Sequence, residues 1–163
     1  MSDALRDALA AELGALLSAR RWRVVTAESC TGGLLAGAIT AIAGSSGWFD
    51  VGYVTYGNDA KIRLLGVSPD ALAHEGAVSE ATARAMAEGA RRASGADLAA
   101  AITGIAGPGG GTAQKPVGLV CFAWSREGSA RAESRRFSGD RGAVREASVI
   151  AALEGLIQIA RDG

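Results

Sequence analysis

A serine followed by a pair of glycines stands at the end of an apolar run, where a strand would pass into a helix, in residues Thr26 to Gly33. Ser29 is a potential nucleophile, and the N–H groups at the start of a helix favour an oxyanion or a phosphate. A structural interpretation fits as well, in which Ser29 or Thr31 caps the helix while Gly32 and its neighbour permit close packing. The local sequence is compatible with both.

A serine nucleophile needs a base, because its hydroxyl must lose a proton as it attacks. Only two of the 17 cationic side chains are lysines, Lys61 and Lys115, and the other 15 are arginines. A guanidinium keeps its proton in a protein whereas an ammonium can release one, so a lysine kept in this background is a candidate base. Lys61 is either a base whose pKa is lowered by burial or by nearby positive charge, or a surface cation that pairs with Asp59.

Three other side chains near these segments have alternative roles. His74, the only histidine, lies in a polar stretch and is better explained as a solvated loop residue than as a member of a Ser-His-Asp triad. Cys30 is either a second nucleophile at the helix start, where thiol pKa values fall, or a small buried residue. Tyr56, at the end of an expected strand, either orients the Lys61 amine or serves only in packing.

A further polar segment follows another expected strand. Thr103 and Gly104 offer a hydroxyl and N–H groups, and a glycine-rich loop that begins at Gly107 comes next. The segment lacks the Walker lysine spacing, so it is not a P-loop. Arg141, at the start of the last expected helix, either clamps a phosphate through two hydrogen bonds or is solvated.

The order of patterned segments predicts a three-layer α/β/α domain with a mixed, mostly parallel sheet and a C-terminal β-hairpin plus helix. Helical spacing and capping residues predict helices over residues 2–19, 32–42, 59–65 and 81–93, and a final helix capped by residues 138–140. Gly66, Ser68 and Pro69 are expected to stop the third of these helices, and Ser79 to cap the fourth. Apolar and β-branched runs predict strands over residues 23–27, 48–56, 97–105, 117–124 and 130–137, the last two forming the hairpin.

The predicted strands place the polar segments together. Residues 48–56 carry apolar side chains on both alternating faces, which predicts a strand covered on both sides. Ligands of open α/β sheets bind beyond the carboxyl ends of strands. We therefore expect residues 28–33, 56–61 and 103–111 to converge on one site.

Composition restricts the class of protein. The chain has 163 residues, 48% of them hydrophobic, which predicts one domain over residues 1–163. Zero formal net charge without a basic run argues against a nucleic-acid partner, and the longest apolar stretches are too short for a membrane span. Two cysteines and the lack of a secretory pattern at the start predict a cytoplasmic protein. One histidine and two separated cysteines make a poor zinc set, so no metal is expected.

Eight segments, in this order, resemble the CinA C-terminal domain family. They are TAESCTGG at 26–33, AGSS at 43–46, VTY at 54–56, N and K at 58 and 61, GAVSE at 76–80, GIAGP at 104–108, KPVG at 115–118 and FSGDR at 137–141. Any one segment is weakly diagnostic, but the eight in register span nearly the whole chain. Stand-alone members of this family are nicotinamide mononucleotide deamidases.

The resemblance implies an amidohydrolase that converts the carboxamide of nicotinamide mononucleotide to the acid and releases ammonia, in pyridine nucleotide recycling. It implies that Ser29 attacks the carboxamide while Lys61 takes its proton, and that Tyr56 and Thr103 assist. The turn from Cys30 to Gly33 would supply oxyanion donors, and no metal or cofactor is required. The residues expected to contact substrate are Glu28, Cys30, Thr31, Gly32, Gly33, Gly104, Gly107 and Arg141.

Two alternatives to this mechanism fit the same segments. One is a non-catalytic module that binds a nucleotide or phosphorylated ligand through the glycine turns and acts through a partner. The other is an amidohydrolase that uses the thiol of Cys30 in place of the Ser29 hydroxyl.

A homodimer is also expected. Family habit favours it, and so does an aromatic pair, Trp48 and Phe49, which the sequence predicts to be exposed.

Overall fold

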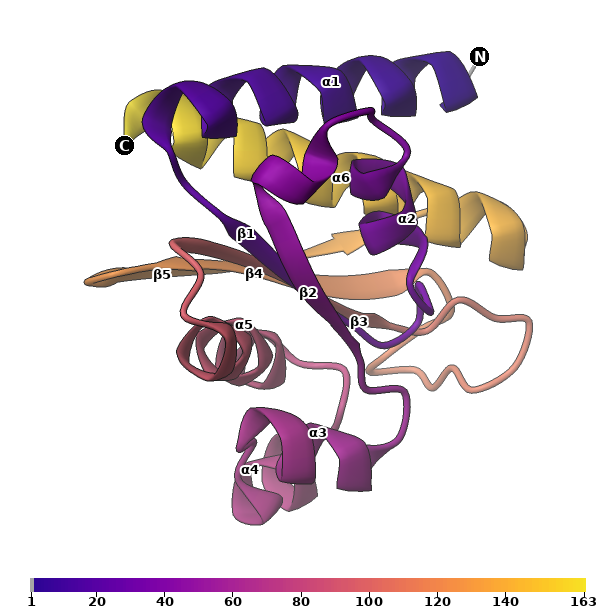
Figure 1. The fold of residues 1–163 in the computed structure, drawn as a ribbon. Coiled ribbons are helices and arrows are strands. Elements are labelled where there is room, and N and C mark those ends of the chain that lie inside the picture. Colours follow the sequence, from indigo (N-terminus) through magenta and orange to yellow (C-terminus); the bar gives the residue numbers. More distant parts are fainter. Residues whose placement is uncertain (1) are drawn as a thin grey trace.

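A mixed sheet lies between two layers of helices in the computed structural model, which describes residues 2–163 (Figure 1). The strands are β1 (Val24–Glu28), β2 (Phe49–Val54), β3 (Leu98–Gly104), β4 (Leu119–Arg126) and β5 (Ser129–Arg136), in the order β2-β1-β3-β4-β5. β1 pairs in parallel with β2 and β3, whereas β4 runs antiparallel to β3 and β5. Four strands of this sheet thus point the same way within the described residues, which confirms the predicted fold class.

Helices cover both faces of the sheet (Figure 1). One face carries α1 (Ser2–Arg20), α2 (Leu34–Thr40) and α6 (Arg141–Asp162), and the other carries α3 (Asn58–Leu65), α4 (Pro69–Glu75) and α5 (Glu80–Ser94). A 3-10 turn, η1 (Ser45–Gly47), precedes β2. Each face buries its own apolar cluster, around Phe122 and Leu153 on the α6 side and around Met86 on the α5 side.

The sequence-based prediction missed α4. It took Ser68 and Pro69 as the end of the preceding helix and placed His74 in a loop. In the structure, the Ser68 hydroxyl accepts the Ala71 N–H at 3.3 Å, and Pro69 occupies the first helical position. A proline is favourable there because that N–H has no partner within the helix. The residues that end α3 therefore also begin α4.

The prediction that both faces of β2 are covered is wrong. β2 is an edge strand that pairs with β1 alone within the described sheet, and its side chains alternate between half-buried and exposed. The strand ends at Val54, so Tyr56 lies in the loop that follows it. Trp48 and Phe49 are half-buried and pack against the core on the α6 side, so the predicted exposed aromatic pair is not found.

The connections between strands leave the carboxyl ends of three strands at one edge of the sheet. The chain passes from β1 through α2 to β2 on one face, then through α3, α4 and α5 to β3 on the other. The carboxyl ends of these three strands are level, because Glu28 of β1 is paired with Val54 of β2 and Ile102 of β3. Such a switch in strand order is where open α/β sheets bind ligands.

A glycine in α5 allows α3 to pack closely against that helix. A Cβ added at Gly89 would lie 1.9 Å from the Leu65 carbonyl oxygen, so only glycine allows the two helices to approach this closely. Lys61 and Leu65, one turn apart, form the buried face of α3. The close contact at Gly89 therefore also positions Lys61.

We expect Gly89→Ala to lower the free energy of unfolding by about 1–3 kcal/mol, because the added methyl group forces α3 away from α5. Gly37→Ala is the matched control, since Gly37 lies in α2 with nothing within 4 Å of an added Cβ. It should raise the free energy of unfolding by about 0.5–1 kcal/mol through the better helix propensity of alanine. Urea denaturation followed by circular dichroism measures both changes, and a Gly89→Ala variant as stable as the wild type would contradict this account of the packing.

Candidate active site

Ser29 and Lys61 meet at the carboxyl edge of the sheet. The Lys61 Nζ lies 3.0 Å from the Ser29 Oγ, although 32 positions separate the two residues. Ser29 directly follows β1, and its N–H donates to the Ile102 carbonyl of β3 at 2.9 Å. Lys61 comes from α3 and is only 1% exposed.

The position of Lys61 in α3 directs its side chain into the protein. Helical side chains tilt toward the helix N-terminus, so Lys61 reaches back to the loop that precedes α3. Its Nζ there donates to the carbonyl oxygens of Thr55 at 2.8 Å and Tyr56 at 3.1 Å. Asp59 instead pairs with Arg63 at 2.8 Å on the exposed face of α3. The interpretation of Lys61 as a surface cation paired with Asp59 is therefore wrong.

The surroundings of Lys61 favour its uncharged form. Burial lowers the pKa of Lys61 from its ordinary value of 10.5, because desolvation penalises the ammonium. None of the ion pairs found within residues 2–163 includes Lys61. The Nζ donates to three oxygens, those of the Thr55 and Tyr56 carbonyls and that of the Ser29 hydroxyl, and when it is neutral its lone pair can instead accept the Ser29 proton. The other acceptor near that hydroxyl, the Tyr56 carbonyl, is more distant at 3.4 Å.

The surroundings of Cys30 disfavour its thiolate form. Burial raises the pKa of Cys30 to about 11, and the residue is 6% exposed. A nucleophilic cysteine needs a lowered pKa to form a thiolate near neutral pH. The structure therefore argues against the alternative in which Cys30 attacks the amide.

Glu28 binds the start of α2. It is fully buried, and its Oε1 accepts the Thr31 hydroxyl at 2.6 Å and the Leu35 N–H at 2.9 Å. Its Oε2 accepts the Ala36 N–H at 3.0 Å. A carboxylate satisfies N–H groups at the positive end of a helix, so Glu28 holds the turn after Ser29 in place rather than facing a ligand. The N–H groups of Leu35 and Ala36 are consequently occupied.

The turn from Cys30 to Gly33 leaves two other N–H groups beside the serine. Gly32 and Gly33 have φ values of 55° and 103°, in the left-handed region that favours glycine. The Gly32 N–H donates back to the Ser29 carbonyl at 3.1 Å. The N–H groups of Cys30 and Thr31 make no hydrogen bond within the range that the structure describes, residues 2–163. Thr31 is fully buried whereas Cys30 is 6% exposed, so of the two only the Cys30 N–H is suited to bind an oxyanion.

Seven of the expected site residues line one cavity of about 230 Å³. They are Ser29, Cys30, Tyr56, Lys61, Thr103, Gly104 and Arg141, and Ala77, Val78 and Ala106 complete the lining. Glu28, Thr31, Gly32, Gly33 and Gly107 are not among the lining residues. The three polar segments thus converge as expected.

Hydrogen bonds tie the walls of this cavity together. The buried Thr103 hydroxyl donates to the Ala77 carbonyl at 2.8 Å. Arg141 reaches from α6 to the Gly107 carbonyl at 2.9 Å and to the Tyr56 phenol oxygen at 3.2 Å. Because Tyr56 is 61% exposed, its phenol lies at the rim, and only its backbone carbonyl contacts the Lys61 amine.

A second cavity adjoins the first. It measures about 550 Å³ and shares Ala106 and Arg141 with the first cavity. Pro108, Val117 and Asp140 are among its other lining residues. A ligand too large for the first cavity can therefore extend past Arg141 into the second.

Three other residues that bear on the site, His74, Thr55 and Arg145, do not line this cavity. His74 lies on α4, is exposed, and its Nδ1 is 2.8 Å from the Asp70 carbonyl oxygen, so no histidine lines the cavity. Sequence reasoning did not single out Thr55, whose contribution is a backbone carbonyl. It also missed Arg145, although the spacing of four residues from Arg141 on one helix is a signal that would have identified it.

Metal-ligand clusters and membrane-spanning helices are both lacking in the described residues. Residues 2–163 contain no group of three or more His, Cys, Asp or Glu side chains placed to hold a metal ion. No helix in that part of the chain combines the length and apolar character needed to cross a bilayer.

Comparison with known proteins gives consistent matches over nearly the whole chain. Residues 6–160 match the family model of the CinA C-terminal domain. A nicotinamide-nucleotide amidohydrolase PncC from Enterobacter agglomerans is 52% identical over 94% of each chain, and one from Escherichia coli K12 is 50% identical over 97% of this chain and 96% of its own. The crystal structure of competence/damage inducible protein CihA from Agrobacterium tumefaciens has a TM-score of 0.93 at 48% identity and covers 95% of each chain.

A Lys61→Met variant tests the lowered lysine pKa. Between the folded pKa of Lys61 and 10.5 the unfolded chain binds more protons than the folded one, so wild-type stability gains with rising pH in that window. Lys61→Met lacks this titration, and the free energy of unfolding of the wild type relative to the variant should therefore rise between pH ~7 and ~10. Urea unfolding across this range measures the difference, and Lys115→Met gives the background slope for loss of a lysine. A difference that stays constant or falls with pH would contradict the burial argument.

Proposed function

This chain belongs to the CinA C-terminal domain family, and we propose that it hydrolyses the carboxamide of nicotinamide mononucleotide to the acid and ammonia, using Ser29 as nucleophile and Lys61 as base. The relatives named nicotinamide-nucleotide amidohydrolase supply the reaction and the substrate class. The observation that carries the mechanism is the contact of 3.0 Å between the Ser29 Oγ and the buried Lys61 Nζ. The reaction serves pyridine nucleotide recycling.

The first half of the reaction forms an acyl-enzyme. The Ser29 oxygen attacks the carboxamide carbon as its proton passes to the neutral Lys61 amine. Negative charge develops on the carboxamide oxygen, where the N–H group of Cys30 stabilises it. The resulting Lys61 ammonium gives its proton to the leaving nitrogen, the C–N bond breaks, and ammonia departs.

The second half releases the acid. Lys61, neutral again, takes a proton from a water molecule that attacks the ester of Ser29. The tetrahedral intermediate collapses, the proton returns to the serine oxygen, and the acid product leaves. Throughout, the carbonyl oxygens of Thr55 and Tyr56 hold the lysine Nζ in place, so a single amine moves every proton.

Thr103 and Tyr56 have positional roles in this scheme. The Thr103 hydroxyl donates to the Ala77 carbonyl, which leaves its oxygen lone pairs to accept an N–H of the substrate amide. The Tyr56 phenol, bound by Arg141, forms the rim through which the substrate enters.

The two adjoining cavities match the two parts of a nicotinamide nucleotide. The catalytic cavity, about 230 Å³, is below the range of about 300–1,000 Å³ typical of pockets for whole small molecules, and suits the pyridine ring with its amide. The larger cavity then receives the ribose phosphate. Arg141 supplies positive charge for the phosphate, and Asp140, whose Oδ1 caps α6, has a second carboxylate oxygen for a ribose hydroxyl.

We expect the purified protein to release ammonia from nicotinamide mononucleotide, and Ser29→Ala and Lys61→Arg to lose about 10³-fold or more in kcat. Lys61→Arg keeps the positive charge but removes the ability to act as a base. Lys115→Arg is the matched control and should retain the wild-type rate within about twofold. Nicotinamide, which lacks the ribose phosphate, should have a much lower kcat/KM than the nucleotide.

Different outcomes exclude different parts of the proposal. Absence of ammonia at enzyme concentrations near that of the substrate, together with tight binding of the nucleotide, would favour the non-catalytic binding module. A Lys61→Arg variant with near wild-type turnover would remove Lys61 from the mechanism. Inactivation by iodoacetamide that Cys30→Ala abolishes would favour the thiol nucleophile.

We further propose that the protein acts in the cytoplasm as a homodimer. Cys30 and Cys121 are both buried free thiols, which suits a reducing compartment. Large apolar side chains are exposed on α2, β2 and α3. They are Leu34, Val54 and Leu64.

Contact between two such surfaces would remove these side chains from water. Light scattering should therefore give twice the chain mass of 16.4 kDa. A mass equal to that of one chain would contradict the dimer.

A further inference from the structure

A third cavity continues the two cavities proposed for the substrate. It measures about 340 Å³ and shares Val117 and Gly139 with the second cavity. Its other lining residues are Arg136, Phe137 and Ser138. Three adjoining cavities therefore lead from Ser29 past Arg141 to Arg136.

The sheet brings Arg136 to the same edge as the nucleophile. β5 points in the same direction as β1 and β3, and Arg136 is its last residue. Arg136 is paired with Leu119 of β4, whose carbonyl accepts the Ile105 N–H at 2.9 Å. Arg136 thus lies two positions beyond the level of Thr103, which lines the first cavity.

The width of the sheet between the two residues fits a mononucleotide. Neighbouring strands lie about 4.8 Å apart, so β5 is about 14 Å from β1 in the order β1-β3-β4-β5. A pyridine ring and a ribose cover most of the way from Ser29 toward β5, and the long side chain of an arginine can cover the rest. The phosphate at the far end of the ribose then comes within reach of Arg136.

Arg136 has its charge and its donors available. Its side chain is exposed, and in the part of the chain from residue 2 to residue 163 it forms neither an ion pair nor a side-chain hydrogen bond. The two other arginines of β5 are engaged, because Arg131 donates to Gln158 at 3.2 Å and Arg135 pairs with Glu133 at 2.8 Å. A ligand that enters the third cavity therefore meets an uncompensated guanidinium.

The backbone beside Arg136 is held in place. The Phe137 N–H donates to the Gly118 carbonyl at 2.9 Å, and a Cβ at Gly118 would collide with the Phe137 carbonyl oxygen. The Phe137 ring packs edge-on against Phe122, with the ring centroids 6.2 Å apart. The free guanidinium is thus attached to an anchored strand end, with the exposed Ser138 in the same cavity.

The charges in the second cavity favour the same direction. Asp140 lines that cavity, and its Oδ1 accepts the Ala143 N–H at 2.9 Å. A carboxylate suits ribose hydroxyls but repels a phosphate. The phosphate is therefore more favourably placed at the border with the third cavity, toward Arg136.

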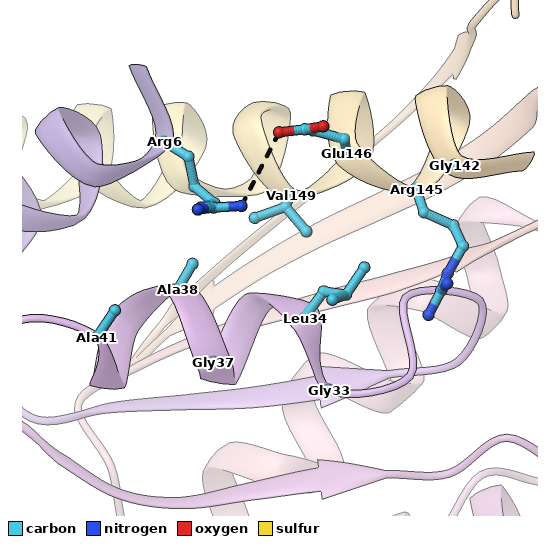
Figure 2. A pocket seen from close by; sticks show the side chains of 10 residues that line it. All are labelled: Arg6, Gly33, Leu34, Gly37, Ala38, Ala41, Gly142, Arg145, Glu146 and Val149. Carbon is cyan, nitrogen blue, oxygen red and sulfur yellow. Dashed lines mark ion pairs between the residues drawn. The ribbon is translucent and has the colours of Figure 1, made fainter. Parts of the chain in front are cut away.

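A fourth cavity, of about 380 Å³ between α2 and α6, offers a competing direction (Figure 2). It shares one lining residue, Gly142, with the second cavity. Both of its arginines are engaged, since the Arg145 Nε donates to the Cys30 carbonyl at 3.0 Å and Arg6 faces Glu146 with charged atoms 3.9 Å apart. The distribution of free charge favours the third cavity over this one.

We propose that Arg136 binds the substrate phosphate, assisted by the Ser138 hydroxyl, and so selects a phosphorylated nucleotide over the corresponding nucleoside. The inference rests on the proposed function for the identity of the substrate and adds the residue on which recognition of its phosphate depends. Because the phosphate is remote from the reacting amide, this contact is equal in the ground state and the transition state. Its loss therefore raises KM and leaves kcat nearly unchanged.

The test measures ammonia release from nicotinamide mononucleotide and from nicotinamide riboside, which lacks the phosphate. For the mononucleotide, Arg136→Ala should lower kcat/KM by about 10-fold to 30-fold through KM, with kcat within about twofold. For the riboside, the same variant should stay within about twofold of the wild type. Arg136→Lys, which keeps the charge, should recover most of the loss on the mononucleotide.

Two control variants remove an arginine elsewhere. Arg135→Ala removes the same charge one position earlier, from a side chain that lies over the Phe122 ring and does not line the third cavity. Arg6→Ala removes a charge from the fourth cavity. Both should stay within about twofold of the wild type on either substrate.

A binding assay does not depend on turnover. Ser29→Ala cannot form the acyl-enzyme, so calorimetry on this variant gives a Kd for the intact mononucleotide. Adding Arg136→Ala should weaken that Kd by about tenfold or more and leave the Kd of the riboside within about twofold. Wild-type protein that releases no ammonia, in combination with this result, would reject the deamidase and support the role of Arg136.

Other outcomes overturn the inference. An Arg136→Ala variant within threefold of the wild type in kcat/KM and Kd for the mononucleotide would do so. Equal losses on the mononucleotide and the riboside would indicate a structural role in place of phosphate recognition. A loss specific to the mononucleotide in Arg6→Ala, absent in Arg136→Ala, would place the phosphate in the fourth cavity. Failure of the mononucleotide to bind or to react would reject the inference together with the proposed function.

Discussion

A buried contact between an amine and a hydroxyl is the constraint on which the rest of this structure depends. Lys61 has no carboxylate to compensate its charge within residues 2–163, and its contact with Ser29 is maintained only if the protein holds both groups rigidly in a dry place. Three parallel strands ending at one edge supply the serine, the two carbonyl oxygens and Thr103. The close packing of α3 against Gly89 of α5 sets how far the amine reaches. Burial both lowers the pKa of Lys61 and supplies its partners, so the fold itself favours the neutral amine that the proposed mechanism requires.

The turn after the serine is held from two sides by side chains of opposite charge. Glu28 accepts N–H groups at the start of α2, while Arg145 donates to carbonyl oxygens on the other side of the turn. Each charge matches the polarity of the peptide groups that it binds. The N–H group of Cys30, which lines the cavity, remains for a ligand beside the Ser29 hydroxyl. Because both of its carboxylate oxygens are bound at the start of α2, Glu28 does not line the cavity although it lies next to Ser29 in the chain.

The sequence predicted the fold class and the three converging segments because these depend on short-range signals. Apolar runs, capping residues and glycines with left-handed backbone act within a few positions, as Ser79 and the α5 helix illustrate. The predictions were wrong where one residue type has two structural roles, or where a residue's environment is set by elements distant in the chain. Pro69 was interpreted as a helix stop although proline also begins helices, and the exposed faces of β2 could not be known before its place at the sheet edge. The burial of Lys61 and the reach of Arg145 depend on elements distant in the chain, so their local sequence carries little of that information.

The protonation of Lys61 is the most direct test of this account. Because the chain contains only two lysines, protein labelled with ¹³C and ¹⁵N in lysine gives two side-chain signals, and Lys115→Arg identifies the one from Lys61. A pH titration of the Lys61 Cε and Nζ shifts in the ligand-free enzyme measures its pKa in the site itself. We expect a midpoint clearly below the ordinary value of 10.5, moving upward in Gly89→Ala as α3 is displaced and water enters. A Lys61 signal that stays that of an ammonium up to pH 10.5 would contradict the central claim.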